Sequence, residues 1–195
     1  MQRVTRQFGI IMLALLLEVG CRSPSASAPI VSMTRPAQEF SIITLNIAHG
    51  RKDGRNQMLQ RTATIRRNLD DIARLLTQTA PDLVALQEAD GPSFWSGKFD
   101  HVQYLAQQAH FSHHTRGSHV NNGRIDYGTA LLSKHPLSKT QSVKFPPSPP
   151  TFNKGFVTAE LTLPPAKTGG PPAADAVITV VSLHLDFSRN SVREK

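Results

Sequence analysis

The chain has 195 residues, of which 39% are hydrophobic and 18% charged, so it suits one globular domain with a buried core and not a wholly disordered chain. Its single cysteine excludes an intramolecular disulfide framework and an all-cysteine zinc cluster. The net charge of +8, with His neutral, suits an anionic partner such as nucleic acid, phosphorylated lipid or a membrane surface, without choosing among them.

Residues 1–28 are predicted to be an export signal, because a positive start is followed by the apolar run Phe8–Leu17, too short for the roughly 20 residues of a membrane-spanning helix. Residues 18–21 are similar to a bacterial lipoprotein cleavage box, whose cysteine, here Cys21, becomes lipidated. Glu18 departs from that box, which normally carries an apolar residue there. Cleavage after Ala28 and an uncleaved apolar tail are the alternatives. Both export routes place the working protein outside the cytoplasm.

Residues 29–38 continue a stretch rich in Ser, Pro and Ala and are predicted to be a linker, which leaves residues 39–195 as the globular domain. That domain begins with Phe40–Ile47, a β-branched run of strand length. From about residue 59 the apolar period becomes helical (Ile65, Leu69, Ile72, Leu76). Leu83–Gln87 then has the short apolar pattern of a buried strand.

A strand, a helix and a strand within about 50 residues predict a βαβ unit with parallel strands. Asn46 and Glu88, each near the end of its strand, should therefore lie close together at the carboxyl edge of the sheet. Open α/β sheets bind their ligands at that edge.

A second helix is predicted over Asp100–Ala109, with Asp100 as its N-cap. Phe111–Gly123 holds three histidines, directly after His110, without a clear period and is predicted to be a loop. Further strands are predicted over Tyr127–Ser133, Val143–Phe145, Phe156–Leu163 and Ala176–His184. Eight of the 14 prolines fall in the spacers 146–150 and 164–172, which therefore cannot be central strands.

Four segments, in order, resemble the endonuclease/exonuclease/phosphatase family of metal-dependent phosphoester hydrolases. They are Ile43–Ile47, Pro81–Glu88, Tyr127–Leu137 and Val181–Asp186. The resemblance covers about residues 40–195 and implies an α/β (α+β) fold, a four-layer α/β/β/α sandwich with two mixed sheets. Spacing alone predicts only an α/β fold with mixed sheets.

Glu88 is the first candidate site residue, because a carboxylate that follows an apolar strand is costly unless it has a partner. It is either an ion-pair partner of an arginine such as Arg51 or Arg124, or a ligand of Mg²⁺ or Mn²⁺, which prefer carboxylate oxygen. The resemblance favours the metal ligand.

The resemblance implies three further site residues. Asn46 would bind metal and phosphate, His184 would contact the scissile phosphate, and Asp126 stands near a position where relatives carry a Tyr or Glu that lines the site. The structural alternatives are a turn-forming Asn and a strand histidine with a purely structural role. His49 is close enough to Asn46 in sequence to line the same cleft.

The remaining histidines form a sequence cluster that could suggest zinc (His110, His113, His114, His119). Zinc needs convergent ligands and a supporting shell rather than mere density, so we interpret the cluster as a solvated loop. The basic stretch Arg51–Arg74 is interpreted as a solvated helix face that could also guide a polyanion.

Two motifs of the family do not occur in the sequence. These are a Gly-Asp-x-Asn strand end, which positions the nucleophilic water, and a Ser-Asp-His that stabilises the phosphate. Ser191–Glu194 has the spacing of a capping box, the signature of a helix start, one residue before the last. We therefore expect a domain that is incomplete at its C-terminus and inactive or impaired as given.

The resulting hypothesis is an exported Mg²⁺- or Mn²⁺-dependent phosphoester hydrolase. Its substrate would be nucleic acid or a phospholipid headgroup, and a lipidated Cys21 could attach it to a membrane. The alternative is a non-catalytic exported module that binds phosphorylated ligands. The oligomeric state is not encoded in any pattern of the sequence.

Overall fold

The computed structural model describes residues 40–147, 149–164 and 175–185. The chain divides into two compact units, Met1–Ala37 and Gln38–Lys195, and every described residue belongs to the second. The predicted signal segment with Cys21, the linker and the capping box lie outside the described residues. No helix in the described part is long and apolar enough to span a bilayer.

The first sheet contains four strands in the order β1-β2-β4-β3. They are β1 (Ile42–Asn46), β2 (Leu83–Asp90), β4 (Asp126–Ser133) and β3 (His113–Asn121). β1 and β2 are parallel, whereas the other two pairs are antiparallel. The predicted βαβ unit is confirmed, and Asn46 lies opposite Gln87 in its register.

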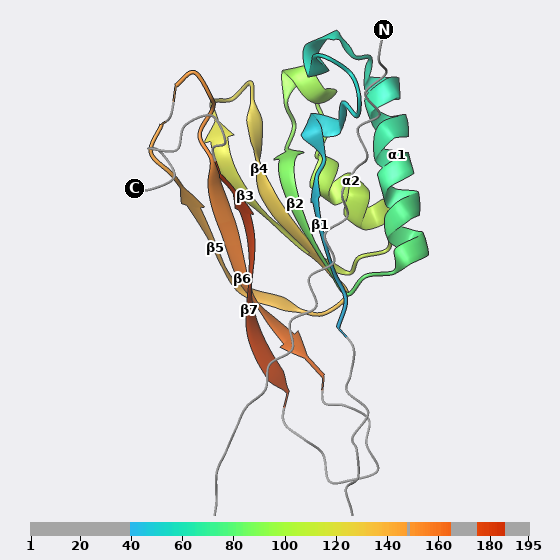
Figure 1. Cartoon of the computed structure of the whole chain (residues 1–195), viewed down its shortest axis with the longest axis vertical. Helices are drawn as coiled ribbons and strands as arrows, with labels where there is room; N and C mark the ends of the chain where they lie inside the picture. Colours follow the sequence, from blue (N-terminus) through green and yellow to red (C-terminus); the bar gives the residue numbers. More distant parts are fainter. Residues whose placement is uncertain (1–39, 148, 165–174, 186–195) are drawn as a thin grey trace, which may run out of the picture. The chain divides into compact units, whose positions relative to one another are not determined.

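Two helices, α1 (Thr62–Thr79) and α2 (His101–Gln108), cover the outer face of this sheet (Figure 1). The apolar period that predicted α1 is the face that it buries, through Ile65, Leu69, Ala73 and Leu76. The Asp100 carboxylate accepts a hydrogen bond from the Gln103 backbone N–H at 2.9 Å, so the predicted N-cap of α2 is confirmed. Short 3₁₀ turns connect these elements: η1 (Ala48–Gly50), η2 (Gln57–Leu59) and η3 (Phe94–Ser96).

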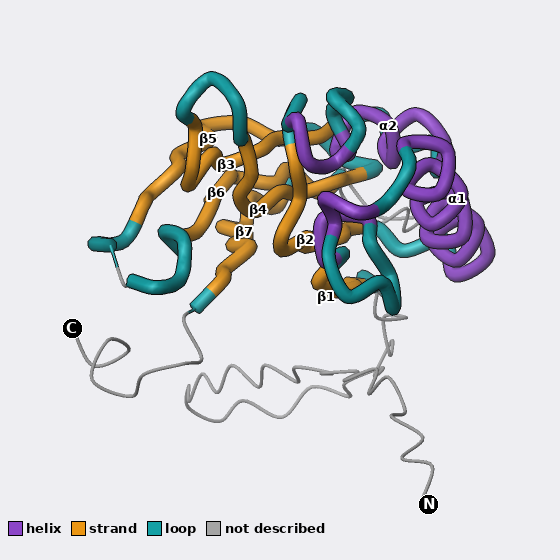
Figure 2. Tube along the Cα trace, turned by 90° about the horizontal axis from the view of Figure 1, so that it is seen from above, coloured by secondary structure: helices purple, strands orange, loops and turns teal. Residues whose placement is uncertain are grey.

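The second sheet is antiparallel in its described strands, which are β5 (Leu137–Lys144), β6 (Gly155–Leu163) and β7 (Ala176–His184) in that order. It packs on the face of the first sheet that the helices leave open, as Figure 2 shows from above. The apolar layer between the sheets comes from both (Leu83, Ala85, Leu131, Val157, Ala159, Leu161, Val180). The predicted α/β sandwich of two sheets is confirmed. Within the described residues, the second sheet is antiparallel rather than mixed, and α1 and α2 both cover the first sheet, so the fourth layer of the expected α/β/β/α order is not seen there.

The predicted loop Phe111–Gly123 is wrong, because most of it forms β3. This strand is polar in composition, so β-branched alternation does not reveal it. Its place is fixed instead by an antiparallel ladder with β4 and by packing against β5. Gly117 and His119, two positions apart, are its buried residues. The strand predicted over Val143–Phe145 is likewise the end of a longer one, β5.

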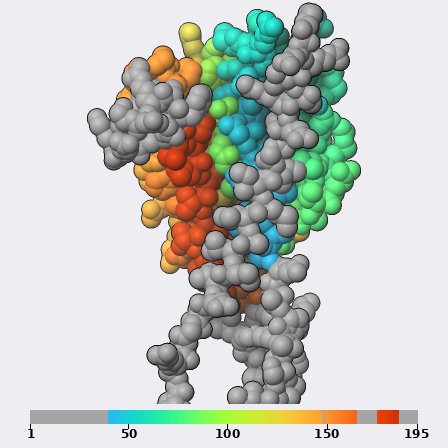
Figure 3. All heavy atoms as spheres, in the orientation of Figure 1, coloured from blue at the N-terminus to red at the C-terminus, as the bar shows by residue number. Residues whose placement is uncertain are grey.

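The two sheets meet along β2 and β7. The Ser182 hydroxyl of β7 donates to the Leu86 carbonyl at 2.8 Å, and the Gln87 side chain donates to Ser182 Oγ at 3.4 Å. In Figure 3, atoms of β7 (red) lie beside those of β1 (blue) and β2 (green) on one face of the molecule. The carboxyl ends of β1, β2 and β7 therefore share one edge of the sandwich.

Candidate functional site

Glu88 occupies a β-bulge near the end of β2, where the pairing with β4 shifts between Gln87 and Ala89. Its φ angle is 50°, in the left-handed region that a non-glycine residue rarely adopts. Such a conformation costs on the order of 1–3 kcal/mol and concentrates at functional sites. The bulge redirects the carboxylate, whose side chain is 17% exposed, toward the shared edge.

Two histidines flank the Glu88 carboxylate. His49 Nε2 lies 3.5 Å from Oε2, and His184 Nε2 lies 3.7 Å from Oε1. Within the described part of the chain, these two are the ion-pair partners of Glu88, and neither Arg51 nor Arg124 is one of them. The arginine pairing that was the structural alternative for Glu88 is thus not observed among the described residues.

His184 reaches the site from the last residue of β7, opposite Gly155 of β6. It is buried, at 8% exposure, and comes from a strand 96 positions later than Glu88 in the chain. His184 therefore lies beside Glu88, while its contact with phosphate stays a prediction.

Asn46 ends β1 one register position from Glu88, since it lies opposite Gln87. Its Oδ1 accepts a hydrogen bond from the Ala48 backbone N–H at 2.9 Å, so it does form a turn. The side chain is exposed, which keeps it accessible to a ligand. Its role in binding metal and phosphate stays a prediction.

The sequence reasoning missed Asp90, which is fully buried beneath Glu88 on the same strand. One Asp90 oxygen lies 2.7 Å from His49 Nδ1, and the other accepts the Trp95 indole N–H at 2.8 Å. The His49 ring also packs against Trp95 and Tyr127, at centroid distances of 5.3 and 5.1 Å, and these two rings contact each other. A carboxylate two residues after Glu88 was the only available signal, because the strand was predicted to end at Gln87.

The pKa of the Tyr127 hydroxyl reflects the negatively charged side chains near it. Burial raises the pKa of its hydroxyl, and the nearby carboxylates Glu88 and Asp90 raise it further. The phenol is therefore neutral at ordinary pH and donates to the Asn153 carbonyl at 3.3 Å. A site with this charge favours a bound cation.

Asp126, the last predicted catalytic residue, has different partners. Its carboxylate accepts two hydrogen bonds from Arg116, at 2.6 and 2.7 Å, and one from the Ser118 hydroxyl at 2.6 Å. Although burial by itself would raise it, these bonds hold the pKa of Asp126 below its usual value. The observed contacts are structural, joining β3 to β4, and the catalytic role stays a prediction.

The histidine cluster is only partly solvated. His119 is 1% exposed and its Nε2 lies 3.0 Å from the Thr129 hydroxyl, so the interpretation as a solvated loop is wrong for this residue. Burial, and then the neighbouring His184, Lys154 and Lys144, lower the pKa of His119 to about 4. Among the described residues, no three or more His, Cys, Asp or Glu side chains are arranged to hold a metal.

The donor set around Glu88 fits a hard divalent ion that keeps most of its own water. Glu88 offers carboxylate oxygen and Asn46 an amide carbonyl, the ligand types that Mg²⁺ and Mn²⁺ take from proteins. Mg²⁺ is usually held by one or two carboxylates together with substrate phosphate rather than by an all-protein cage. Glu88 and Asn46 are the residues that would hold the ion.

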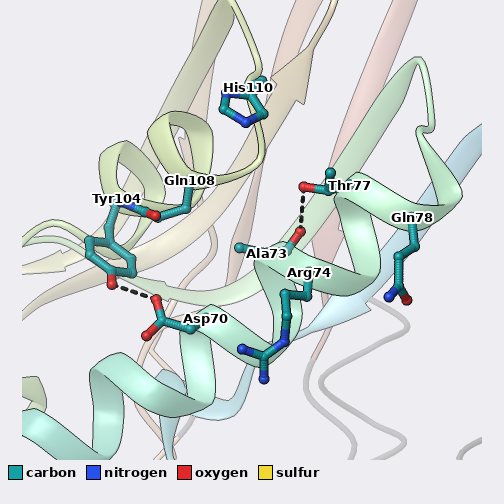
Figure 4. A pocket seen from close by; sticks show the side chains of 8 residues that line it. All are labelled: Asp70, Ala73, Arg74, Thr77, Gln78, Tyr104, Gln108 and His110. Carbon is teal, nitrogen blue, oxygen red and sulfur yellow. Dashed lines mark hydrogen bonds between the residues drawn. The ribbon is translucent and has the colours of Figure 1, made fainter.

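A groove of about 610 Å³ lies elsewhere, between α1 and α2 (Figure 4). Its lining residues are Asp70, Ala73, Arg74, Thr77, Gln78, Tyr104, Gln108 and His110. The Tyr104 hydroxyl donates to Asp70 at 2.5 Å, and the Thr77 hydroxyl donates to the Ala73 carbonyl at 2.9 Å. None of the residues around Glu88 lines this groove.

Comparison with solved structures gives three with a TM-score of 0.50. An endonuclease/exonuclease/phosphatase family protein from Leptotrichia buccalis is 17% identical, with 79% of this chain and 58% of that chain covered. An endonuclease/exonuclease/phosphatase from Beutenbergia cavernae is 19% identical (78% and 40%), and TDP2 from Caenorhabditis elegans is 18% identical (80% and 37%). The chain thus spans between about a third and three fifths of their lengths.

No curated protein matches the sequence. The model of the Endonuclease/Exonuclease/phosphatase family, however, matches residues 43–182, which is most of the chain. The match includes Asn46, Glu88 and most of both sheets, and it ends two residues before His184. Since the fold and the matched segments agree, the chain belongs to the Endonuclease/Exonuclease/phosphatase family.

Proposed function

We propose that the protein is a divalent-metal-dependent hydrolase of phosphoesters, acting on a phosphodiester of nucleic acid or of a phospholipid headgroup. The observation that carries the proposal is Glu88, a carboxylate held in a left-handed bulge at the edge where three strands end. Family membership supports the reaction class.

The residues divide the work by their chemistry. Glu88 and Asn46 would hold Mg²⁺ or Mn²⁺, which when bound neutralises phosphate charge and acts as a Lewis acid. His184 Nε2 faces the same carboxylate at 3.7 Å and would donate a hydrogen bond to a phosphate oxygen. The rings of Tyr127 and Trp95 pack against His49 on the same side of the site.

The experiment is metal-dependent hydrolysis by the full chain. Bis-p-nitrophenyl phosphate tests the reaction class, while plasmid DNA and phosphatidylcholine vesicles test the two substrate classes. We expect turnover that is removed by EDTA and by Glu88→Gln. It should be kept by Glu160→Gln, which alters the ion pair between Glu160 of β6 and Lys139 of β5. Phosphate binding that survives EDTA without any turnover would instead favour a non-catalytic module.

We further propose that the chain as given turns over slowly, because the two family motifs that position water and stabilise phosphate do not occur in its sequence. The same assay checks this against any longer product of the gene. A rate equal to that of the longer product would contradict it.

The export proposal concerns residues outside the described part. We propose that the protein leaves the cytoplasm and that Cys21 carries a lipid. Intact-mass measurement of the membrane fraction tests it with Cys21→Ala as the control. A mature chain that begins after Ala28 in both proteins would contradict lipidation while keeping export.

A further inference from the structure

The His49 side chain is held in place by a hydrogen bond to a fully buried carboxylate. Its Nδ1 lies 2.7 Å from Asp90, a carboxylate with no exposure, whose other oxygen is occupied by Trp95. An ionised carboxylate only accepts hydrogen bonds, so the proton of this contact belongs to His49 Nδ1. That bond fixes the orientation of the imidazole ring and directs Nε2 away from Asp90.

Nε2 is directed at Glu88, 3.5 Å from its Oε2. This distance is long for a direct hydrogen bond, and the fixed ring occupies the space beside the carboxylate, so His49 limits where the carboxylate can turn. A buried carboxylate that fixes a histidine, which in turn faces the metal-binding group, is the arrangement by which outer residues orient a metal site.

The backbone of both residues is strained in the same sense. Ala48 and His49 have φ angles of 48° and 56°, and Glu88 has 50°. Left-handed non-glycine residues cost energy and persist only where the surroundings enforce them. Here the strained turn after β1 and the strained bulge of β2 bring the two side chains face to face.

We propose that His49, fixed by Asp90 and Trp95, is a positioning residue that holds the Glu88 carboxylate in the orientation that binds the divalent ion. The inference rests on the proposed function and extends it, because it assigns the metal affinity of the site to a residue that need not contact the metal. Asp90 and Tyr127, two buried residues that contact His49, then become part of the site.

The sharpest variant is His49→Asn. The asparagine amide nitrogen takes the place of Nδ1 and can still donate to Asp90, while nothing replaces Nε2 toward Glu88. Asparagine also tolerates a left-handed backbone. The matched control is His110→Asn, the same substitution at another left-handed histidine (φ 60°), which lines the groove between α1 and α2.

Trp95 supplies a readout that does not need turnover. It is the one tryptophan of the sequence, and its ring lies 5.3 Å from that of His49. Paramagnetic Mn²⁺ bound at Glu88 should quench its fluorescence, so titration with MnCl₂ gives a midpoint for metal binding. Circular dichroism melts of each variant check that the fold is kept.

We expect saturable quenching in the unaltered chain, none with Glu88→Gln, an unchanged midpoint with His110→Asn, and a midpoint about 10- to 100-fold higher with His49→Asn. Any hydrolysis lost in His49→Asn should return at high Mn²⁺, which a merely structural defect would not allow. If His49→Asn does not fold, His49→Gly replaces it, with the same expected rise, because glycine also tolerates the left-handed backbone and leaves no nitrogen facing Glu88.

The possible failures are distinguishable. Quenching that depends on Glu88 but is unchanged by substituting His49 would overturn the positioning role and leave the proposed function intact. Absence of quenching in the unaltered chain would overturn the metal site, and the positioning role with it.

Discussion

The edge where β1, β2 and β7 end and the groove between α1 and α2 hold their charged side chains in different ways. At the edge, Asp90 has no exposure and both of its oxygens have buried partners. At the helices, Asp71 is 43% exposed and pairs with Lys52 and Arg74 on the surface. Exposed pairs of the second kind contribute about 0–1 kcal/mol and are common.

The backbone differs in the same direction. His49 and Glu88 adopt left-handed conformations in the middle of the edge. The helices that form the groove are regular, and the left-handed residues beside them, Ala80 and His110, stand just after the ends of α1 and α2, where such a conformation is ordinary. The groove has volume, but the hydrogen bonds that Tyr104 and Thr77 make in it are to Asp70 and to the Ala73 carbonyl, and no buried carboxylate is among the described residues that line it. Strain and buried charge, rather than hollow space, therefore identify the candidate site.

The largest expected effect is on Glu88→Gln. The change keeps the size of the side chain but removes its charge, so metal-dependent hydrolysis should fall by about 100- to 1,000-fold, the several kcal/mol that a Lewis-acid metal supplies. The unfolding free energy should change little, because the ion-pair partners of Glu88 among the described residues are two histidines, at 3.5 and 3.7 Å. Steady-state rates with and without Mg²⁺ check this. A rate within threefold of the original, which is a change of roughly 0.7 kcal/mol in the activation free energy, would show that Glu88 is not central to hydrolysis.

The next effect concerns acid stability through His119. Its folded pKa of about 4 lies below its ordinary 6.5, so the folded state holds the neutral form. The associated stability is complete above pH 6.5 and is lost as the pH falls toward 4, by up to about 3 kcal/mol. Urea unfolding at pH 7, 5.5 and 4.5 should show a steeper loss for the original chain than for His119→Gln.

The exposed His114 on the same strand is the matched control. Its replacement by Gln should leave the pH dependence of the unfolding free energy unchanged. Equal slopes for the original chain and His119→Gln would instead mean that His119 does not titrate differently on folding.

A smaller effect is expected for Asp126→Asn, which tests whether Asp126 takes part in the reaction or only stabilises the strands near the site. The change leaves Arg116 without its closest charge partner, so the unfolding free energy should drop by about 1–2 kcal/mol, less than for a fully buried pair. Relative activity should fall no more than Asp71→Asn, the surface control. An activity loss of tenfold or more in folded protein, equal to about 1.4 kcal/mol of activation free energy, would instead support a catalytic role for Asp126.

The smallest effect is expected in the groove. Tyr104→Phe removes the hydrogen bond to Asp70 and should cost about 0.5–1.5 kcal/mol in thermal unfolding. Hydrolysis rates should not change, because Tyr104 and its neighbours lie outside the edge. A lowered kcat with unaltered stability would show that the groove takes part in function.

Local patterns carried much of the fold. The apolar period gave the buried face of α1, the N-cap gave the start of α2, and the β-branched runs gave β4, β6 and β7. They failed at β3, whose polar side chains carry no alternation that a strand pattern requires. A strand of that kind is specified by its neighbour, β4, and so cannot be recognised in isolation.

The site divides in the same way. A carboxylate after a buried strand and an amide after its parallel neighbour were sufficient to predict that Glu88 and Asn46 share an edge, and the register places them one position apart. Asp126 was predicted from proximity in sequence to a motif, and its side chain turned instead to Arg116 on the adjacent strand. The sequence shows that a carboxylate stands at the end of a strand, whereas the residue that the carboxylate binds depends on which side chains the neighbouring strand places beside it.

The amino-acid sequence by itself determined the family, the βαβ unit and the carboxylate at the centre of the candidate site, because periodicity and burial are properties of consecutive residues. Only the tertiary structure decided that a bulge redirects Glu88, that β7 delivers His184 beside it, and that Asp90 fixes His49. These contacts join residues 41 to 96 positions apart. They depend on register and on how the two sheets pack, which no local pattern encodes.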